Sequence, residues 1–415
     1  MSEKIPRLYY IDWLRVITVF LLVPFHAGVI FIFSSSWWIN NVEKSLATNA
    51  LVAVLDQYHM PLLFLVAGAA TWFSLGRRSG GEYLLERTKR LLVPAVIVSL
   101  VFIAPNHFLS QQHYFYQDPA QQAMLDFGLR EPFGSYFEHY PYILRENLLP
   151  FTEGWSPGLL WFVWYLILFT LVLLPIFLLI RRKGDGFTSI LATFLEKRGA
   201  IFLLFIPLAL VQIYPPPPIM DSYIFRTFPM YYHMIFFIYG FFLFSNPHIQ
   251  RGLERSGPIA VVGGIITMTI FMLLVFPPDG RAPLGNLFWP NLGSEPGTAG
   301  HFIYWTLRAI NGWFWITGLL YLSKRFLNFS NRLLRYANDA VLPFYMMHET
   351  IIVVVGFYVI ETGLAVGLKY GIIVTSAYVL TLLLYEIIRR NNVTRFLMGM
   401  RLKRKIEDFN SAEPG

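Results

Sequence analysis

The sequence contains no cysteine and few charged residues. None of its 415 residues is Cys, which excludes disulfide bonds, thiolate metal sites and a cysteine nucleophile. Charged residues make up 14% of the chain, against roughly 25% in an average soluble domain. Hydrophobic residues make up 55%, which is more apolar surface than a soluble core can absorb. We therefore expect a membrane protein.

The apolar residues occur in long blocks separated by short charged segments. Blocks of about 17–25 residues match the length that a helix needs to cross ~30 Å of hydrocarbon at ~1.5 Å per residue. They lack the alternation of barrel strands, so we predict an all-α polytopic membrane bundle of about ten transmembrane helices. The predicted spans lie near residues 11–33, 50–75, 91–109, 158–180, 199–214, 228–245, 258–276, 302–322, 341–360 and 370–388. The fifth is the shortest, because the run Pro215–Pro218 cannot continue a helix.

The positions of Lys and Arg predict the orientation of the bundle. If the N-terminus is cytoplasmic, 25 of the 33 basic residues fall in the inner segments. Cytoplasmic loops are enriched in basic residues, so both termini are predicted to be cytoplasmic. The same bias accounts for the net charge of +8 without a nucleic-acid partner, and we predict none.

We predict a single membrane domain at residues 11–390, between a cytoplasmic N-terminal segment (1–10) and a basic cytoplasmic tail (391–415). Two long outer loops, about 106–157 and 277–300, either cap the outer mouth of the bundle, where an acceptor could be held, or only anchor the chain at the lipid interface. His107 and His113 in the first loop lack a second spaced pair, so we predict no metal site.

The first span carries the richest set of ionisable groups, and such groups are costly in a membrane unless they face protein or water. Arg15 and His26 are eleven residues apart, which returns to within about 20° of the same helix face, about 16 Å further along the axis. Asp12 lies one turn before Arg15 and can pair with it. Alternatively, Arg15 is a snorkelling interface residue and His26 a hydrogen-bonded core histidine.

The spacing of Arg15 and His26 resembles the Arg-x10-His signature of the membrane-bound acyltransferase-3 family. Further segments resemble motifs of this family in the same order, with Ala67 where the family usually has Ser: His59–Gly68, Arg87–Pro94, Trp161–Leu166 and Tyr336–His348. The resemblance covers about residues 7–390. Three other segments resemble the branch that succinylates periplasmic glucans, although branches that acetylate other glycans share them: Tyr9–Arg15, Ile213–Pro216 and Leu384–Ile387.

The resemblance implies transfer of a succinyl or acetyl group from cytoplasmic acyl-CoA to a hydroxyl of an extracytoplasmic glycan, such as a periplasmic glucan, by a multi-pass protein of the bacterial inner membrane. Coenzyme A carries phosphates, and the planar charge of arginine suits them. We expect Arg15 to bind these phosphates with help from Arg87, Lys89 and Arg90. We expect His26 to act as general base; a covalent acyl-histidine intermediate is the alternative.

Two more histidines are candidate catalytic residues, together with Asp12. His59 begins the second span from the outer side and either lines the acceptor mouth or is an interface histidine. His348, beside Glu349 in the ninth span, either contacts CoA, orients a neighbour or forms a helix-to-helix hydrogen bond. We interpret the remaining polar groups inside spans as structural: Arg308, Asn311 and Glu386.

A transporter or flippase for a glycan or lipid-linked substrate is the main competing interpretation. Buried Arg, His and Asp side chains would also suit proton-coupled transport. Against it, the sequence has no inverted repeat and no matching pair of helices broken by Gly or Pro. Membrane lipid is expected around the bundle in either case, and no motif indicates an oligomeric state.

Overall fold

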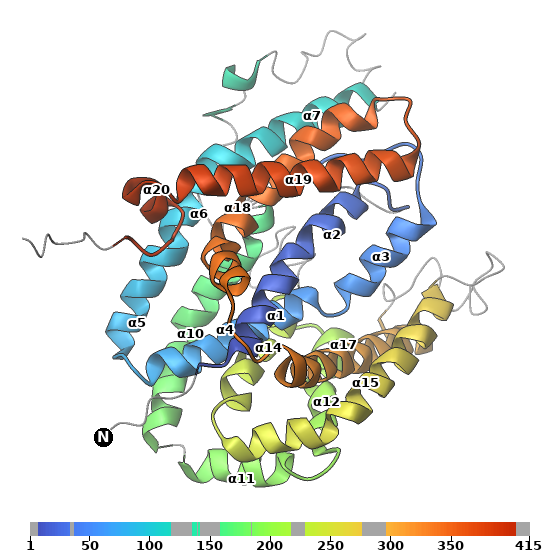
Figure 1. The fold of residues 1–415 in the computed structure, drawn as a ribbon. Coiled ribbons are helices and arrows are strands. Elements are labelled where there is room, and N and C mark those ends of the chain that lie inside the picture. Colours follow the sequence, from blue (N-terminus) through green and yellow to red (C-terminus); the bar gives the residue numbers. More distant parts are fainter. Residues whose placement is uncertain are drawn as a thin grey trace, which may run out of the picture.

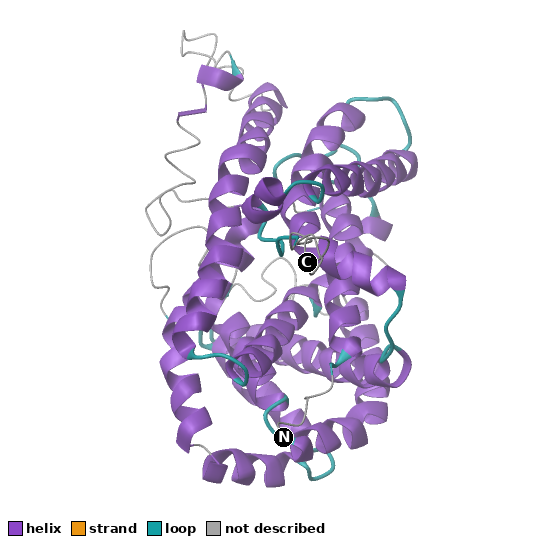
Figure 2. Ribbon diagram, turned by 60° about the vertical axis from the view of Figure 1, so that its left-hand side comes forward, coloured by secondary structure: helices purple, strands orange, loops and turns teal. Residues whose placement is uncertain are grey.

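Every regular element in the described residues of the computed structural model is a helix, as predicted (Figure 2). The structure describes residues 7–33, 37–117, 135–138, 140–141, 158–183, 185–216, 229–275 and 296–403. Most of the two predicted outer loops lies outside these residues. The helices pack around α1, α2 and α18, which lie in the interior of the bundle (Figure 1).

The helices of the first half of the chain are α1 (Tyr9–Phe20), α2 (Leu22–Val29), α3 (Leu46–Asp56), α4 (His59–Leu75), α5 (Gly80–Arg87), η1 (Thr88–Leu92), α6 (Val93–Val98), η2 (Ser99–Ile103), α7 (Ala104–Gln117), η3 (Gly158–Leu160), α10 (Trp161–Lys183) and α11 (Asp185–Leu195). Those of the second half are η4 (Ala200–Leu204), α12 (Phe205–Ile213), α14 (Met230–Leu243), α15 (Pro247–Val275), α17 (Ala299–Phe326), α18 (Arg332–Ile360), α19 (Val366–Ile388) and α20 (Asn392–Leu397).

Helices occupy all ten positions at which the sequence predicts a span. Seven helical segments are long and apolar enough to cross a membrane: Tyr9–Val29, Leu46–Leu75, Gly80–Tyr114, Gly158–Arg182, Pro247–Leu274, Arg332–Ile360 and Val366–Ile388. Two shorter apolar helices, Ala200–Ile213 and Met230–Leu243, and the long helix α17 occupy the other three positions. The protein is thus a multi-pass membrane protein, while the number of ten spans and the side of the termini stay predictions.

Prolines break the first two spans into shorter helices. A proline ring clashes with the carbonyl four residues earlier and donates no hydrogen bond of its own. Pro24 therefore separates α2 from α1, and the Phe20 carbonyl that it frees accepts a hydrogen bond from the Tyr378 hydroxyl at 2.8 Å. Pro61 likewise cannot donate a hydrogen bond to the carbonyl of Gln57, and Gln57 lies between α3 and α4. The two breaks lie just before the segments that carry His26 and His59.

Close packing of α4 against α14 fixes the centre of the bundle. A Cβ atom added at Gly68 would clash with the Phe237 carbonyl, and one added at Gly240 would clash with the Leu65 carbonyl. The two backbones are therefore in direct contact at a pair of glycines, as is common where membrane helices cross.

Candidate active site

The first and ninth predicted spans bring two histidines together. His26 Nδ1 lies 3.0 Å from His348 Nε2, although the two residues are 322 positions apart in the chain. One turn before His348, the ring of Phe344 stacks on Phe20 of α1 with centroids 4.3 Å apart, which fixes the register of α18 against α1. His348 is completely buried, whereas 17% of the His26 side chain is accessible. His26 is therefore the more accessible of the two rings.

A single backbone carbonyl determines which nitrogens of this pair carry hydrogen. His348 Nδ1 lies 2.7 Å from the Tyr345 carbonyl oxygen, which can only accept, so Nδ1 is the donor. In a neutral imidazole the other nitrogen then has the lone pair, and His348 Nε2 accepts from His26 Nδ1. In a neutral His26 the Nε2 atom is then unprotonated, which is the state that a general base requires.

Glu349 completes the group with a buried carboxyl group close to His26. Its Oε2 lies 3.9 Å from His26 Nδ1, and its Oε1 accepts a hydrogen bond from the Trp38 indole. The neighbouring Trp37 stacks on the His26 ring, with centroids 5.6 Å apart. A negative charge at this position would stabilise the His26 imidazolium. The sequence places Glu349 beside His348 but gives no signal that Trp38, in a connecting segment, holds it.

His59 lies next to this group without a hydrogen bond to it. Its Nδ1 is 2.7 Å from the Leu55 carbonyl, so its Nδ1 carries hydrogen as well. Its ring contacts Phe25, which precedes His26, at a centroid distance of 4.4 Å. His59 is buried, at 3% exposure, rather than open to an interface. It is close enough to interact with the charge of His26.

Arg15 lies on α1, eleven residues before His26 on α2, and has hydrogen-bond donors to spare. Its Nη2 contacts Asp12 Oδ1 at 3.5 Å and also donates to the side chain of Asn338 on α18. Within the described part of the chain, its Nε is buried and has no hydrogen-bond partner. Asp12 also accepts from Arg7 at 2.8 Å. The pairing of Asp12 with Arg15 that the sequence predicts is therefore present.

Other arginines surround Arg15 at this end of the bundle. Arg15, Arg87, Arg90 and Arg401 are close enough for their charges to repel one another. Arg87 is held by the Tyr83 and Thr71 hydroxyls, at 3.0 and 3.2 Å. Like charges gathered in this way favour an anionic ligand that neutralises them. We call these four residues the arginine cluster; Lys89 of the predicted set is exposed on η1.

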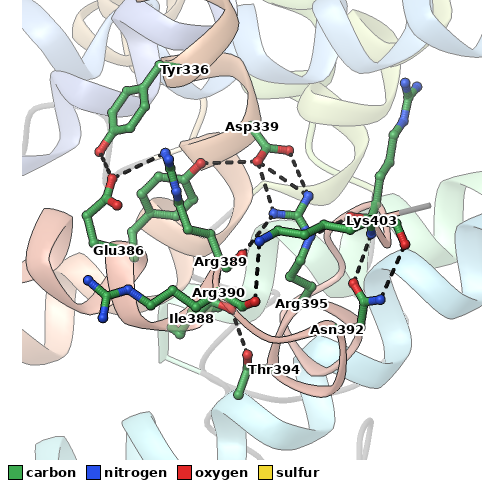
Figure 3. A network of polar contacts seen from close by, with 12 residues as sticks. Tyr336, Asp339, Glu386, Ile388, Arg389, Arg390, Asn392, Thr394, Arg395 and Lys403 are labelled. Carbon is green, nitrogen blue, oxygen red and sulfur yellow. Dashed lines mark hydrogen bonds and ion pairs between the residues drawn. The ribbon is translucent and has the colours of Figure 1, made fainter. Parts of the chain in front are cut away.

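Arg401 joins the cluster because the C-terminal segment folds back onto the bundle. Asp339 of α18 accepts hydrogen bonds from Arg395 at 3.4 Å and from Tyr385 at 3.1 Å (Figure 3). Arg395 in turn donates to the Arg401 carbonyl at 2.7 Å. Gly399, with a φ of +66°, packs its backbone against the Arg90 carbonyl. Part of the predicted tail is therefore a packed helix, α20, which composition and charge alone did not indicate.

The fold and the site together define a multi-pass membrane protein whose first predicted span carries an arginine among other basic groups and a histidine paired with a second histidine. Comparison with known families gives the same result. The model of the acyltransferase domain matches residues 8–387, so the chain belongs to the acyltransferase-3 family, as its motifs predict.

Within this family, the chain is similar to curated proteins that share one name. The chain is 21% identical over 410 residues to glucans biosynthesis protein C of Salmonella schwarzengrund, with 96% of each chain covered. It is also 21% identical over 405 residues to the protein of that name from Escherichia coli strain SMS-3-5, covering 95% of this chain and 94% of the relative. No solved structure matches the chain. The chain is thus a membrane protein of an acyltransferase family, related to the glucan branch that its sequence resembles.

Proposed function

We propose that the protein is an O-acyltransferase that moves an acyl group, succinyl or acetyl, from cytoplasmic acyl-CoA to a hydroxyl of an extracytoplasmic glycan. The observation that carries this proposal is the contact of His26 with His348, which leaves Nε2 of a neutral His26 without hydrogen, together with the arginine cluster around Arg15 in the same predicted span. The name of the relatives, glucans biosynthesis protein C, supports a glucan as the acceptor.

The arginine cluster forms the donor end of the proposed site. Phosphate groups prefer planar, multiply donating guanidinium groups, and the unpartnered Nε of Arg15 offers one such donor. The positive-inside rule places this basic end in the cytoplasm, where acyl-CoA is available. The pantetheine arm then covers the ~16 Å from Arg15 to His26 and brings the thioester beside the imidazole.

His26 supplies the proton transfer. Its Nε2 takes the proton of the acceptor hydroxyl while the hydroxyl oxygen attacks the thioester carbonyl carbon. The tetrahedral intermediate collapses, the C–S bond breaks, and the CoA sulfur takes the proton back from the imidazolium. During the step, His348 accepts from His26 Nδ1 and the carboxylate of Glu349 faces the new positive charge. The products are the acylated hydroxyl and free CoA.

Radiolabelled acetyl-CoA or succinyl-CoA, supplied to the purified protein with a glucan, tests the proposal. We expect labelled glucan and CoA release from the wild type, and a loss of about 10²–10⁴-fold in His26→Ala. The matched control is His301→Ala, which removes another buried histidine, bonded to the Ile213 carbonyl. The proposal fails if His26→Ala retains wild-type transfer. Glycan movement across the membrane without CoA release would favour the transporter interpretation.

A further inference from the structure

An ion pair lies inside the bundle away from the His26 group. Arg308 Nη2 of α17 is 2.6 Å from Asp56 Oδ2 at the end of α3. The Asp56 side chain is nevertheless 43% accessible, and that of Arg308 is 19% accessible. A charged pair within predicted spans is costly against hydrocarbon. Its accessible surface must therefore face water or a ligand.

This ion pair lies at the depth of His26. The backbone of α2 at Gly28 is close to Val52 and Thr48 of α3, since a Cβ atom added at Gly28 would lie 3.0 Å from Val52 Cγ2. The two helices therefore run side by side, and one turn beyond Val52 the chain reaches Asp56. His59 follows at the level of Phe25, with which it is in ring contact.

Polar and aromatic side chains of α14 and of α17 itself surround the pair. Tyr232 and His233 of α14 and Tyr304 of α17 are close enough to interact with its charges. The Arg308 guanidinium also lies over the Trp305 ring, 5.9 Å from its centroid. His59 interacts electrostatically with both Asp56 and His26. The pair is thus joined to the proposed catalytic base through one intervening histidine.

We propose that Asp56 and Arg308 bind the hydroxyl groups of the acceptor sugar and hold the reacting hydroxyl toward His26. This inference rests on the proposed function, and it gives Arg308 a binding role in place of a structural one. The carboxylate accepts from one hydroxyl while the guanidinium donates to the oxygen of its neighbour. Tyr232, Tyr304 and Trp305 provide aromatic surface for the apolar faces of a sugar ring.

Enzyme kinetics with Asp56→Asn separate acceptor binding from a structural role. We expect this variant to raise the KM for the glucan acceptor about tenfold or more, with the Kd for CoA unchanged. Glu254→Gln is the matched control, because Glu254 pairs with Lys324 of the same helix α17 and its side chain is also 43% accessible. An acceptor KM in Asp56→Asn that equals that of Glu254→Gln would overturn the inference.

Direct sugar binding provides a test that does not depend on turnover. Glucose disaccharides with (1→2), (1→3), (1→4) and (1→6) linkages are mixed with the purified protein, and saturation-transfer NMR reports which of them bind. We expect a signal for at least one disaccharide with the wild type and Glu254→Gln, and none with Asp56→Asn. Equal signals in all three proteins, or none in the wild type, refute the sugar site. Absent CoA binding in the wild type would instead refute the proposed function.

Discussion

Through the contact between His26 and His348, one backbone carbonyl of α18 determines which nitrogen of His26 carries hydrogen. The Tyr345 carbonyl fixes the hydrogen on His348 Nδ1, and this leaves His26 with its hydrogen on Nδ1 and its lone pair on Nε2. A histidine whose second nitrogen is held in this way keeps one tautomer and one ring orientation. His348 is therefore a positioning residue for His26 in the proposed reaction.

Substitution of His348 tests this role at the scale of a single residue. His348→Leu removes the acceptor for His26 Nδ1, so we expect kcat to fall about 100-fold or more, as the tautomer of His26 is no longer fixed. His348→Gln keeps an acceptor oxygen of similar reach and should retain more activity. The measurement is label transfer at saturating acyl-CoA. A purely structural role would lower the stability and kcat of both variants equally.

At the scale of the helix, the crossing of α4 and α14 depends on two glycines, Gly68 and Gly240. Because Gly240 faces the Leu65 carbonyl without space for a methyl group, Gly240→Ala must push the helices apart. We expect it to lower the free energy of unfolding by about 1–3 kcal/mol or more. Thermal unfolding of the purified protein in detergent measures the loss.

Gly371→Ala in α19 is the control for this prediction. A Cβ atom added at Gly371 meets nothing within 4 Å, and alanine favours a helix over glycine by up to about 1 kcal/mol. We expect this variant to unfold at the same temperature as the wild type or at a slightly higher one. Equal destabilisation of both variants would contradict direct backbone contact at Gly240.

At the scale of the whole molecule, the first helix and the C-terminal segment both contribute to the arginine cluster. Arg401 comes from the C-terminal segment and Arg15 from the first helix, and their charges interact. We therefore expect Arg401→Gln to raise the Kd for CoA by roughly three- to tenfold at low salt, and less at high salt, because exposed charges are screened. Calorimetric titration with CoA measures the change.

Lys403→Gln is the matched control for Arg401→Gln. Lys403 is exposed two residues further along the chain, and its Nζ contacts the Arg390 carbonyl at 3.3 Å. Its substitution removes one basic charge from the same segment, outside the cluster. An equal rise in Kd for both variants would mean that the general charge of the tail attracts CoA, without a specific role for Arg401.

The sequence by itself determined the helical class and the positions of the apolar helices, and it predicted the pairing of Asp12 with Arg15. These features follow from the length of apolar blocks and from helix periodicity, which are local properties of the chain. The family also followed from the sequence, because its motifs occur in a fixed order along the chain.

Only the tertiary structure decided which residues meet. The contact of His26 with His348, the carboxylate of Glu349 held by Trp38, and Arg401 in the cluster all join segments that are far apart in the chain. Such contacts depend on the packing register of whole helices, as at Phe20 and Phe344, and no local pattern encodes that register. The sequence therefore identified the segment that carries His26, and the packing of α18 beside it brought His348 within hydrogen-bond distance.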